Sequence, residues 1–226
     1  MSNSMTPEFL PTLSAGQHPP GSGEACVMEY VSLLAGESWS DNPACTHPAL
    51  AAMARNVNDR LPDSERHRLV PLIGRLFGTA PSGPERLVLS VRLAVWAARE
   101  VLAFTRREDR VVCEAAIVAA EGWCEGKVSA EECGVAAAAT YATAADAATY
   151  AATYAAAAKA AAAKAAANAA ARAAAYAARA AADYAADADP VDLLSRLIDE
   201  YDRLTGRTNH RHVSDEELRA LAEAIR

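Results

Sequence analysis

Aromatic residues and long runs of large apolar residues are scarce in this chain. Aromatic residues make up 6% of its 226 residues, and the 52% of hydrophobic letters consists mainly of alanine. No stretch of about 18 large apolar residues occurs, so a membrane-spanning helix is not expected. The first residues, MSNSMTPE, lack the basic and apolar regions of a secretory signal. We therefore expect a cytoplasmic chain with no membrane partner.

The sequence also lacks the common nucleotide-binding and hydrolase motifs. It contains no GxGxxG, GxxxxGK[ST], GxSxG or HExxH, so dinucleotide, nucleoside triphosphate and common hydrolase chemistry have no motif support. Basic residues number 22 against 29 acidic ones, which gives a net charge of −7. An acidic chain is unsuited to sequence-independent binding of phosphate backbones, and nucleic acid is excluded as an expected partner.

The cysteines of this sequence do not occur in closely spaced pairs. The five cysteines are widely spaced and form no CxxC, which favours reduced, mostly buried thiols over a disulfide framework. Cys26, Glu29, Cys45 and His47 nevertheless carry the ligand types of a zinc site. An alternative on the same residues is a cysteine enzyme, with Cys26 or Cys45 as nucleophile and His47 as base. Buried structural roles compete with both hypotheses.

Apolar periodicity and capping residues predict an all-α fold. Residues 1–24 are rich in Pro, Gly and Ser and are expected to form a disordered tail. A helical domain is expected over residues 25–128, with a nearly all-apolar central helix and a kink at Pro71. Predicted helices span residues 25–35, 49–61, 63–77, 87–104 and 107–126, and C-terminal helices packing on the same core are predicted within residues 190–226.

Alanine dominates the region between residues 129 and 189. It supplies 36 of the 53 residues from 136 to 188, and neither Gly nor Pro interrupts that run. Alanine loses no side-chain entropy in a helix, so one long helix is predicted. A hairpin that bends near Lys159 to Lys164 is the alternative. The fold class is therefore a helical bundle built around one long Ala-rich helix.

At 100° per residue the non-alanine residues of this helix fall on one face. Two interpretations stay open, since tyrosines on such a stripe suit a protein-binding surface but can also cover neighbouring helices. An antifreeze-like, ice-binding helix is not expected, because Thr140, Thr143, Thr149 and Thr153 do not repeat every eleven residues. The candidate binding surface consists of Tyr150, Tyr154, Asn168, Arg172, Tyr176 and Arg179.

Two segments carry a resemblance to known groups of proteins. ACVMEYVSLLAGE at 25–37, WSD at 39–41, PACTHPAL at 43–50 and VND at 57–59 resemble actinobacterial and actinophage proteins with no assigned activity. EAAI at 114–117 and AEGW at 120–123, with the Ala-rich run, are similar to helical immunity proteins. The resemblance implies an all-helical protein, phage or mobile-element borne, that binds another protein.

Together these observations predict a non-enzymatic binding or adaptor protein, immunity-like or phage-encoded. It would bind a protein partner, or a second copy of itself, through the tyrosine and charge stripe. The alternative is a small metal-dependent or cysteine enzyme centred on Cys26, Glu29, Cys45 and His47.

Overall fold

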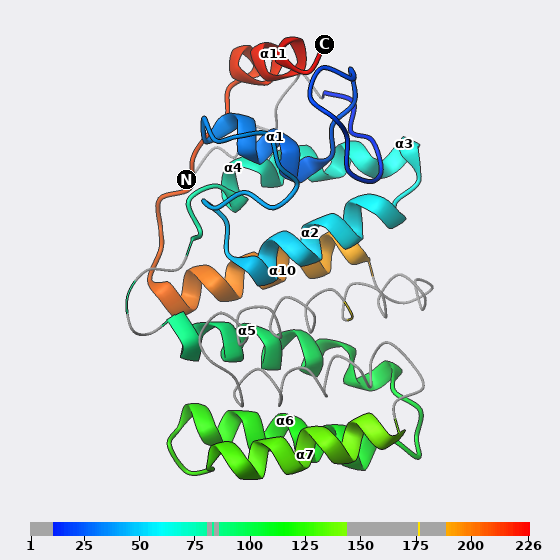
Figure 1. Cartoon of the computed structure of the whole chain (residues 1–226), viewed down its shortest axis with the longest axis vertical. Helices are drawn as coiled ribbons and strands as arrows, with labels where there is room; N and C mark the ends of the chain where they lie inside the picture. Colours follow the sequence, from blue (N-terminus) through cyan, green and yellow to red (C-terminus); the bar gives the residue numbers. More distant parts are fainter. Residues whose placement is uncertain (1–10, 81–82, 84–85, 144–175, 177–188) are drawn as a thin grey trace, which may run out of the picture.

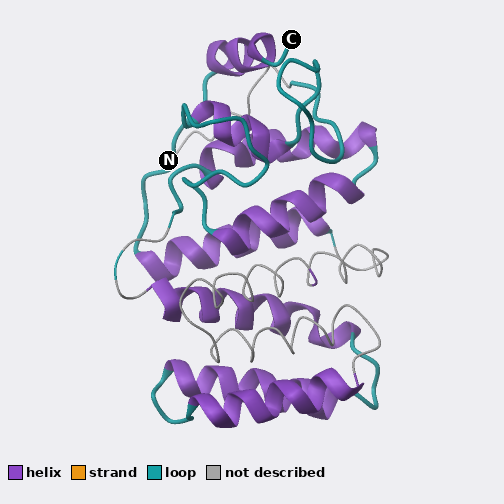
Figure 2. Ribbon diagram, viewed as in Figure 1, coloured by secondary structure: helices purple, strands orange, loops and turns teal. Residues whose placement is uncertain are grey.

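The structure, a computed structural model, describes residues 11–80, 83, 86–143, 176 and 189–226. Every regular element in this part of the chain is a helix (Figures 1 and 2), which confirms the expected all-α fold. The described cysteines are all free thiols, as their spacing predicted. None of the helices in these ranges combines the length and apolar character needed to cross a membrane.

Helices α1 (Val27–Leu34) and α2 (Pro48–Arg60) form where apolar periodicity predicted them. In α2 the His47 side chain caps the first turn by accepting the Ala49 N–H, and Pro48 occupies a position where a missing N–H costs nothing. One face of α2 is buried, because Leu50, Met53, Ala54 and Val57 recur at helical spacing.

The helix predicted over residues 63–77 is broken by its proline, as expected. Pro71 lies inside a 3₁₀ segment, His67–Leu72, because a proline ring cannot supply the N–H of an α-helical bond. Gly78 then follows with φ of +71°, a conformation in which glycine ends a helix without strain. The 3₁₀ segment lies between α3 (Asp63–Arg66) and α4 (Ile73–Leu76).

Helix α5 (Arg86–Val101) is central, as its nearly all-apolar sequence predicted, and a short 3₁₀ segment, Leu102–Phe104, extends it. It packs against α2, α6 (Arg110–Cys124) and α10 (Pro190–Thr205). Its buried residues include Val91, Leu93, Ala94, Ala97, Ala98 and Val101.

Helix α7 (Ala130–Thr143) begins the Ala-rich region and lies antiparallel to α6. Its first turn is capped as the sequence predicted, because the Ser129 hydroxyl accepts the Glu132 N–H and the Glu132 carboxylate accepts the Ser129 N–H. Apart from Tyr176, residues 144–188 lie outside the described residues. The continuous helix over 129–189 and its hairpin alternative both remain predictions.

The C-terminal helices also follow their sequence signals. In α10 Asp189 caps the first turn by accepting the Val191 N–H, and Gly206 ends the helix with φ of +69°. Ser214 and Glu217 form the predicted capping box of α11 (Asp215–Ala224). The stripe of α10 buries Val191, Leu194, Leu197, Ile198 and Tyr201.

The helices are stacked along the long axis of the molecule (Figure 1). α11, α1 and α4 lie at one end, followed by α2, α10 and α5, and the α6–α7 hairpin forms the opposite end. One hydrophobic core contains buried side chains from residue 13 to residue 225. The two ends are therefore built from different parts of the sequence around a shared core.

The N-terminal loop differs from the prediction of a disordered tail. Residues 11–24 contain no helix or strand, as their composition indicated, but they lie against the core. Leu13 is buried, the Ser14 N–H donates to Ala25 O at 2.9 Å, and the Gly16 N–H donates to the Asp59 carboxylate at 2.8 Å. The prediction of a disordered tail is therefore wrong for residues 11–24. Residues 1–10 lie outside the described residues.

Gly74 allows the C-terminal link to pack against α4. A Cβ atom built on Gly74 would lie 2.1 Å from the Arg211 backbone oxygen, whereas one on Gly134 in α7 would meet no atom within 4 Å. A backbone oxygen cannot move aside as a flexible side chain can. Gly74 is thus required by close approach, and Gly134 is not.

We predict opposite effects for these two glycines. Gly74→Ala should lower the free energy of unfolding by about 1–3 kcal/mol because of overpacking. Gly134→Ala should raise it by roughly 0.5–1 kcal/mol, since alanine loses less backbone entropy in a helix. Urea unfolding followed by circular dichroism measures both, and a Gly74→Ala protein as stable as the wild type would contradict the close approach.

Candidate functional site

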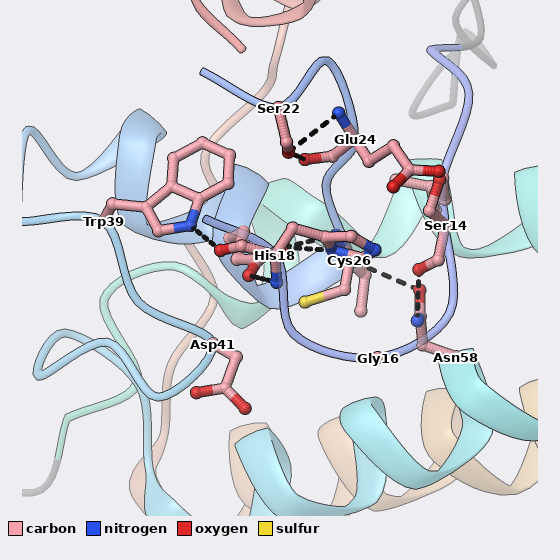
Figure 3. A network of polar contacts seen from close by, with 12 residues as sticks. Ser14, Gly16, His18, Ser22, Glu24, Cys26, Trp39, Asp41 and Asn58 are labelled. Atoms are coloured by element: carbon pink, nitrogen blue, oxygen red, sulfur yellow. Dashed lines mark hydrogen bonds and ion pairs between the residues drawn. The ribbon is translucent and has the colours of Figure 1, made fainter. Parts of the chain in front are cut away.

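A buried carboxylate organises the region in which the sequence placed metal and catalytic candidates (Figure 3). Glu29 of α1 has no exposed surface. Its Oε2 accepts the Cys26 N–H at 2.7 Å and lies 2.9 Å from His18 Nδ1, while its Oε1 accepts the His18 N–H at 2.7 Å. A buried charge is tolerated only when such hydrogen bonds replace water. Glu29 therefore holds the N-terminal loop on the start of α1.

The same network reaches α2 through Asn58. The Asn58 Oδ1 accepts the Val27 N–H at 3.2 Å, and its Nδ2 donates to Ser14 O at 2.8 Å. On the other side the Trp39 indole N–H donates to His18 O at 2.7 Å. These bonds satisfy backbone groups of the loop that would otherwise be buried without partners. The role of the network is therefore structural, because it connects the N-terminal loop with α1 and α2.

Cys26 is not placed to act as a nucleophile. Its side chain is buried, and this burial raises the pKa of its thiol to about 12. The thiolate is the reactive form of cysteine, so at neutral pH this side chain remains a protonated, unreactive thiol. The geometry does not favour the cysteine-enzyme hypothesis at Cys26.

His47 and Cys45 lie elsewhere, at the start of α2. The His47 Nδ1 accepts the Ala49 N–H at 3.1 Å, and its Nε2 lies 3.2 Å from the Ser90 hydroxyl. Cys45 Sγ lies 3.6 Å from the Thr46 hydroxyl oxygen. Both nitrogens of the His47 ring therefore have partners, which leaves neither directed at a metal.

The four candidate zinc ligands do not form one group. Cys26 and Glu29 are neighbours through the network above, whereas His47 and Cys45 bond to other residues. Across the ranges that the structure describes, no three His, Cys, Asp or Glu side chains are grouped as metal ligands would be. The prediction of a zinc site rested on residue types alone. In the structure these residues cap helices and form hydrogen bonds.

Of the tyrosine and charge stripe, only Tyr176 falls within the described residues. It is half-buried and packs against the main core, which is the covering role that competed with a binding role. Tyr150, Tyr154, Asn168, Arg172 and Arg179 lie outside the described residues, so the stripe as a binding surface stays a prediction.

The α6–α7 hairpin carries an apolar surface that the sequence analysis did not single out. Val111 and Val118 of α6 are 75% and 51% exposed, and Val135 of α7 is 67% exposed. These three are the exposed large apolar side chains among the described residues. Val111 and Val118 lie seven residues apart and therefore on one side of α6. The spacing in sequence indicates a shared side of the helix, but it does not show that this side is exposed.

The contacts between the helices fix the height of Val135 along the hairpin, and Val135 lies on the side of α7 opposite Cys133 and Ala137, which contact α6. Cys133 Sγ donates to Ala119 O at 3.3 Å, and Ala116 packs against Ala137. In this antiparallel register Val135 is level with Val118 on the neighbouring helix. We use the name valine face for the three exposed valines of the hairpin, Val111 and Val118 on α6 and Val135 on the outer side of α7.

Two carboxylates lie along the same helices. Glu114 of α6 lies between the two valines in sequence, and Glu131 of α7 lies one turn before Val135. Both are exposed, and neither forms an ion pair with another described residue. The valine face is therefore accompanied by two exposed carboxylates outside ion pairs of the described residues, of which Glu114 also acts on the Arg99 guanidinium.

No family model, curated protein or solved structure matches this chain. The site must therefore be interpreted from its own residues.

We predict that the Glu29 carboxylate is needed for stability. Glu29→Gln replaces one accepting oxygen with an NH₂ group that faces N–H donors, and should lower the free energy of unfolding by roughly 1.5–3 kcal/mol. Glu24→Gln, in an exposed side chain of the same loop, is the matched control. Equal stability of the two variants in urea unfolding would show that the network is not structural.

A second prediction concerns alkaline pH. Because burial raises the pKa of Cys26 from 9.0 to about 12, the folded protein retains a proton that the unfolded chain loses above pH 9. The free energy of unfolding should therefore be unaffected below pH 9 and fall as the pH rises toward 12. The part due to Cys26 is roughly 1 kcal/mol at about pH 10.

Cys26→Ala should make this pH dependence shallower in urea unfolding series. A residual slope is expected, since burial also raises the pKa of Tyr30 to about 12. An unchanged slope in Cys26→Ala would contradict the assignment.

Proposed function

We propose that this chain is a non-enzymatic, immunity-like adaptor that binds another protein, and that the valine face of the α6–α7 hairpin is part of its contact surface. The observation that carries the proposal is that all the large exposed apolar side chains of the described residues belong to these two helices. Exposed apolar side chains that share one side of a helix, as Val111 and Val118 do, are typical of interaction surfaces.

The composition of the hairpin suits packing against a partner helix. Exposed alanines, Ala115 on α6 and Ala138 and Ala139 on α7, accompany the valines. Small side chains let another backbone approach closely, and each valine moved from water into an interface contributes up to roughly 1.5–3 kcal/mol. The three valines would form the apolar centre of such an interface, and charged residues its rim.

Charge indicates which partner this surface fits. Glu114 and Glu131 form no ion pair within the described part of the chain, and the whole chain has a net charge of −7. A partner segment with apolar side chains flanked by Lys or Arg would complement both features. Phosphate-rich nucleic acid would be repelled by the same charges. We therefore assign the valine face to a basic protein.

The resemblance of the sequence supports this proposal. The likeness to immunity proteins and to actinophage chains implies an all-helical protein that binds another protein. The predicted stripe of Tyr150, Tyr154, Asn168, Arg172, Tyr176 and Arg179 belongs to the same proposal as a second contact region.

Binding can be tested before the partner is identified. Wild-type protein and Val118→Glu/Val135→Glu would be compared in pull-downs from a lysate of the source organism, with quantitative mass spectrometry. We expect a basic protein to be captured by the wild type and reduced at least about tenfold by the double variant, because two carboxylates are placed in an apolar interface. Ala220→Glu, on the exposed side of α11, is the matched control and should retain capture.

Charge reversal gives an independent arm. Glu114→Lys/Glu131→Lys should weaken capture and its dependence on salt, because it removes the attraction while leaving the valines intact. Capture that is unaffected by both double variants would remove the valine face from the proposal. A second copy of the chain as the captured protein would contradict the basic partner.

A further inference from the structure

A cleft of about 430 Å³ lies on the side of α5 toward the ends of α6 and α10. Its apolar wall is formed by Val95, Trp96 and Leu204. A smaller hollow of about 250 Å³ adjoins it, since it shares Arg92 and Leu204 and adds Val88 and Leu89. Ligand sites in proteins have such volumes and combine apolar walls with a few polar groups.

The carboxylates that line the cleft are neutralised by cations. Glu121 forms a bidentate ion pair with Arg99, with both N···O distances at 2.7 Å, and Glu200 pairs in the same way with Arg203. The two remaining pairs are Glu100 with Arg196 and Glu125 with Lys127. Each of these carboxylates therefore has a cationic partner of its own.

Arg92 is the exception among the charges of the cleft. Within the described residues its guanidinium forms no ion pair with a carboxylate. Its neighbour is the Cys124 thiol, and burial raises the pKa of that thiol, so it stays neutral and does not take the place of an anion. Beside its apolar walls the cleft therefore presents a guanidinium that forms no ion pair with a carboxylate of the described residues, although Glu125, whose pKa is lowered mainly by Lys127, is near enough for Arg92 to lower it further.

We propose that this cleft binds a small organic monocarboxylate with an apolar body. The carboxylate would accept hydrogen bonds from Arg92, whose planar guanidinium matches two carboxylate oxygens. The apolar body would lie against Val95, Trp96 and Leu204. A single negative charge fits best, because four glutamates surround the cleft and α6 and α10 both end there, where a helix carries partial negative charge.

The test compares four ligands of known charge on the full-length protein. In isothermal titration calorimetry, 4-phenylbutyrate should bind saturably to the wild type, phenyl phosphate at least about fivefold more weakly, and 2-phenylethylamine not measurably. Inorganic phosphate should not bind either, because it lacks the apolar body. Arg92→Gln should weaken phenylbutyrate binding about tenfold or more, the loss expected for a charged hydrogen bond.

The controls separate the site from general charge. Arg107→Gln removes the same charge from an exposed arginine outside the cleft and should leave the affinity unchanged, and Arg92→Lys should restore part of it. Arg92 is itself exposed, so its variants should fold normally by circular dichroism. Lack of saturable phenylbutyrate binding, equal affinity of wild type and Arg92→Gln, or equal losses in Arg92→Gln and Arg107→Gln would overturn the proposal.

Discussion

The need to solvate one buried carboxylate shapes the N-terminal half of the molecule. Glu29 lies in the first turn of α1 with no access to water, and its oxygens are satisfied by groups of Cys26 and His18. Holding His18 there requires residues 11–24 to follow the surface of the core, although their composition resists regular structure. The same loop then brings Leu13 O to the buried guanidinium of Arg66 at 3.3 Å. A local charge thus fixes a segment that has no secondary structure of its own.

Local signals in the sequence were sufficient for the helices. The capping boxes at Ser129 and Ser214, the break at Pro71 and the stop at Gly206 depend on neighbours within a few residues. The candidate site depended on distant contacts. Cys26 and Glu29 have the residue types of metal ligands, but their roles are decided by His18, eleven residues from Glu29. The valine face was equally out of reach, because a residue's exposure depends on which helices pack against its own.

Helix α6 links the two surfaces to which we assign binding. Val111 and Val118 face solvent, while Glu121 and Cys124 near its end line the cleft with α5 and α10. Its paired Glu121 also fixes Arg99 of α5. A helix is rigid over this length. A ligand in the cleft and a partner on the valine face would therefore both contact the same rigid helix. The two surfaces differ in chemistry, one being apolar with negative charge at its edge and the other holding a single positive charge.

The C-terminal residues and the N-terminal loop lie together at one end of the molecule. The Gly23 N–H donates to Ile225 O at 2.8 Å, so the C-terminal residues lie beside the N-terminal loop. Figure 1 places this junction at the end of the molecule opposite the α6–α7 hairpin. A molecule anchored to a bead, a sensor chip or a fused domain through its last residue would therefore project the hairpin away from the support. The fold itself thus presents the hairpin to solvent when the C-terminal residues are attached to a support.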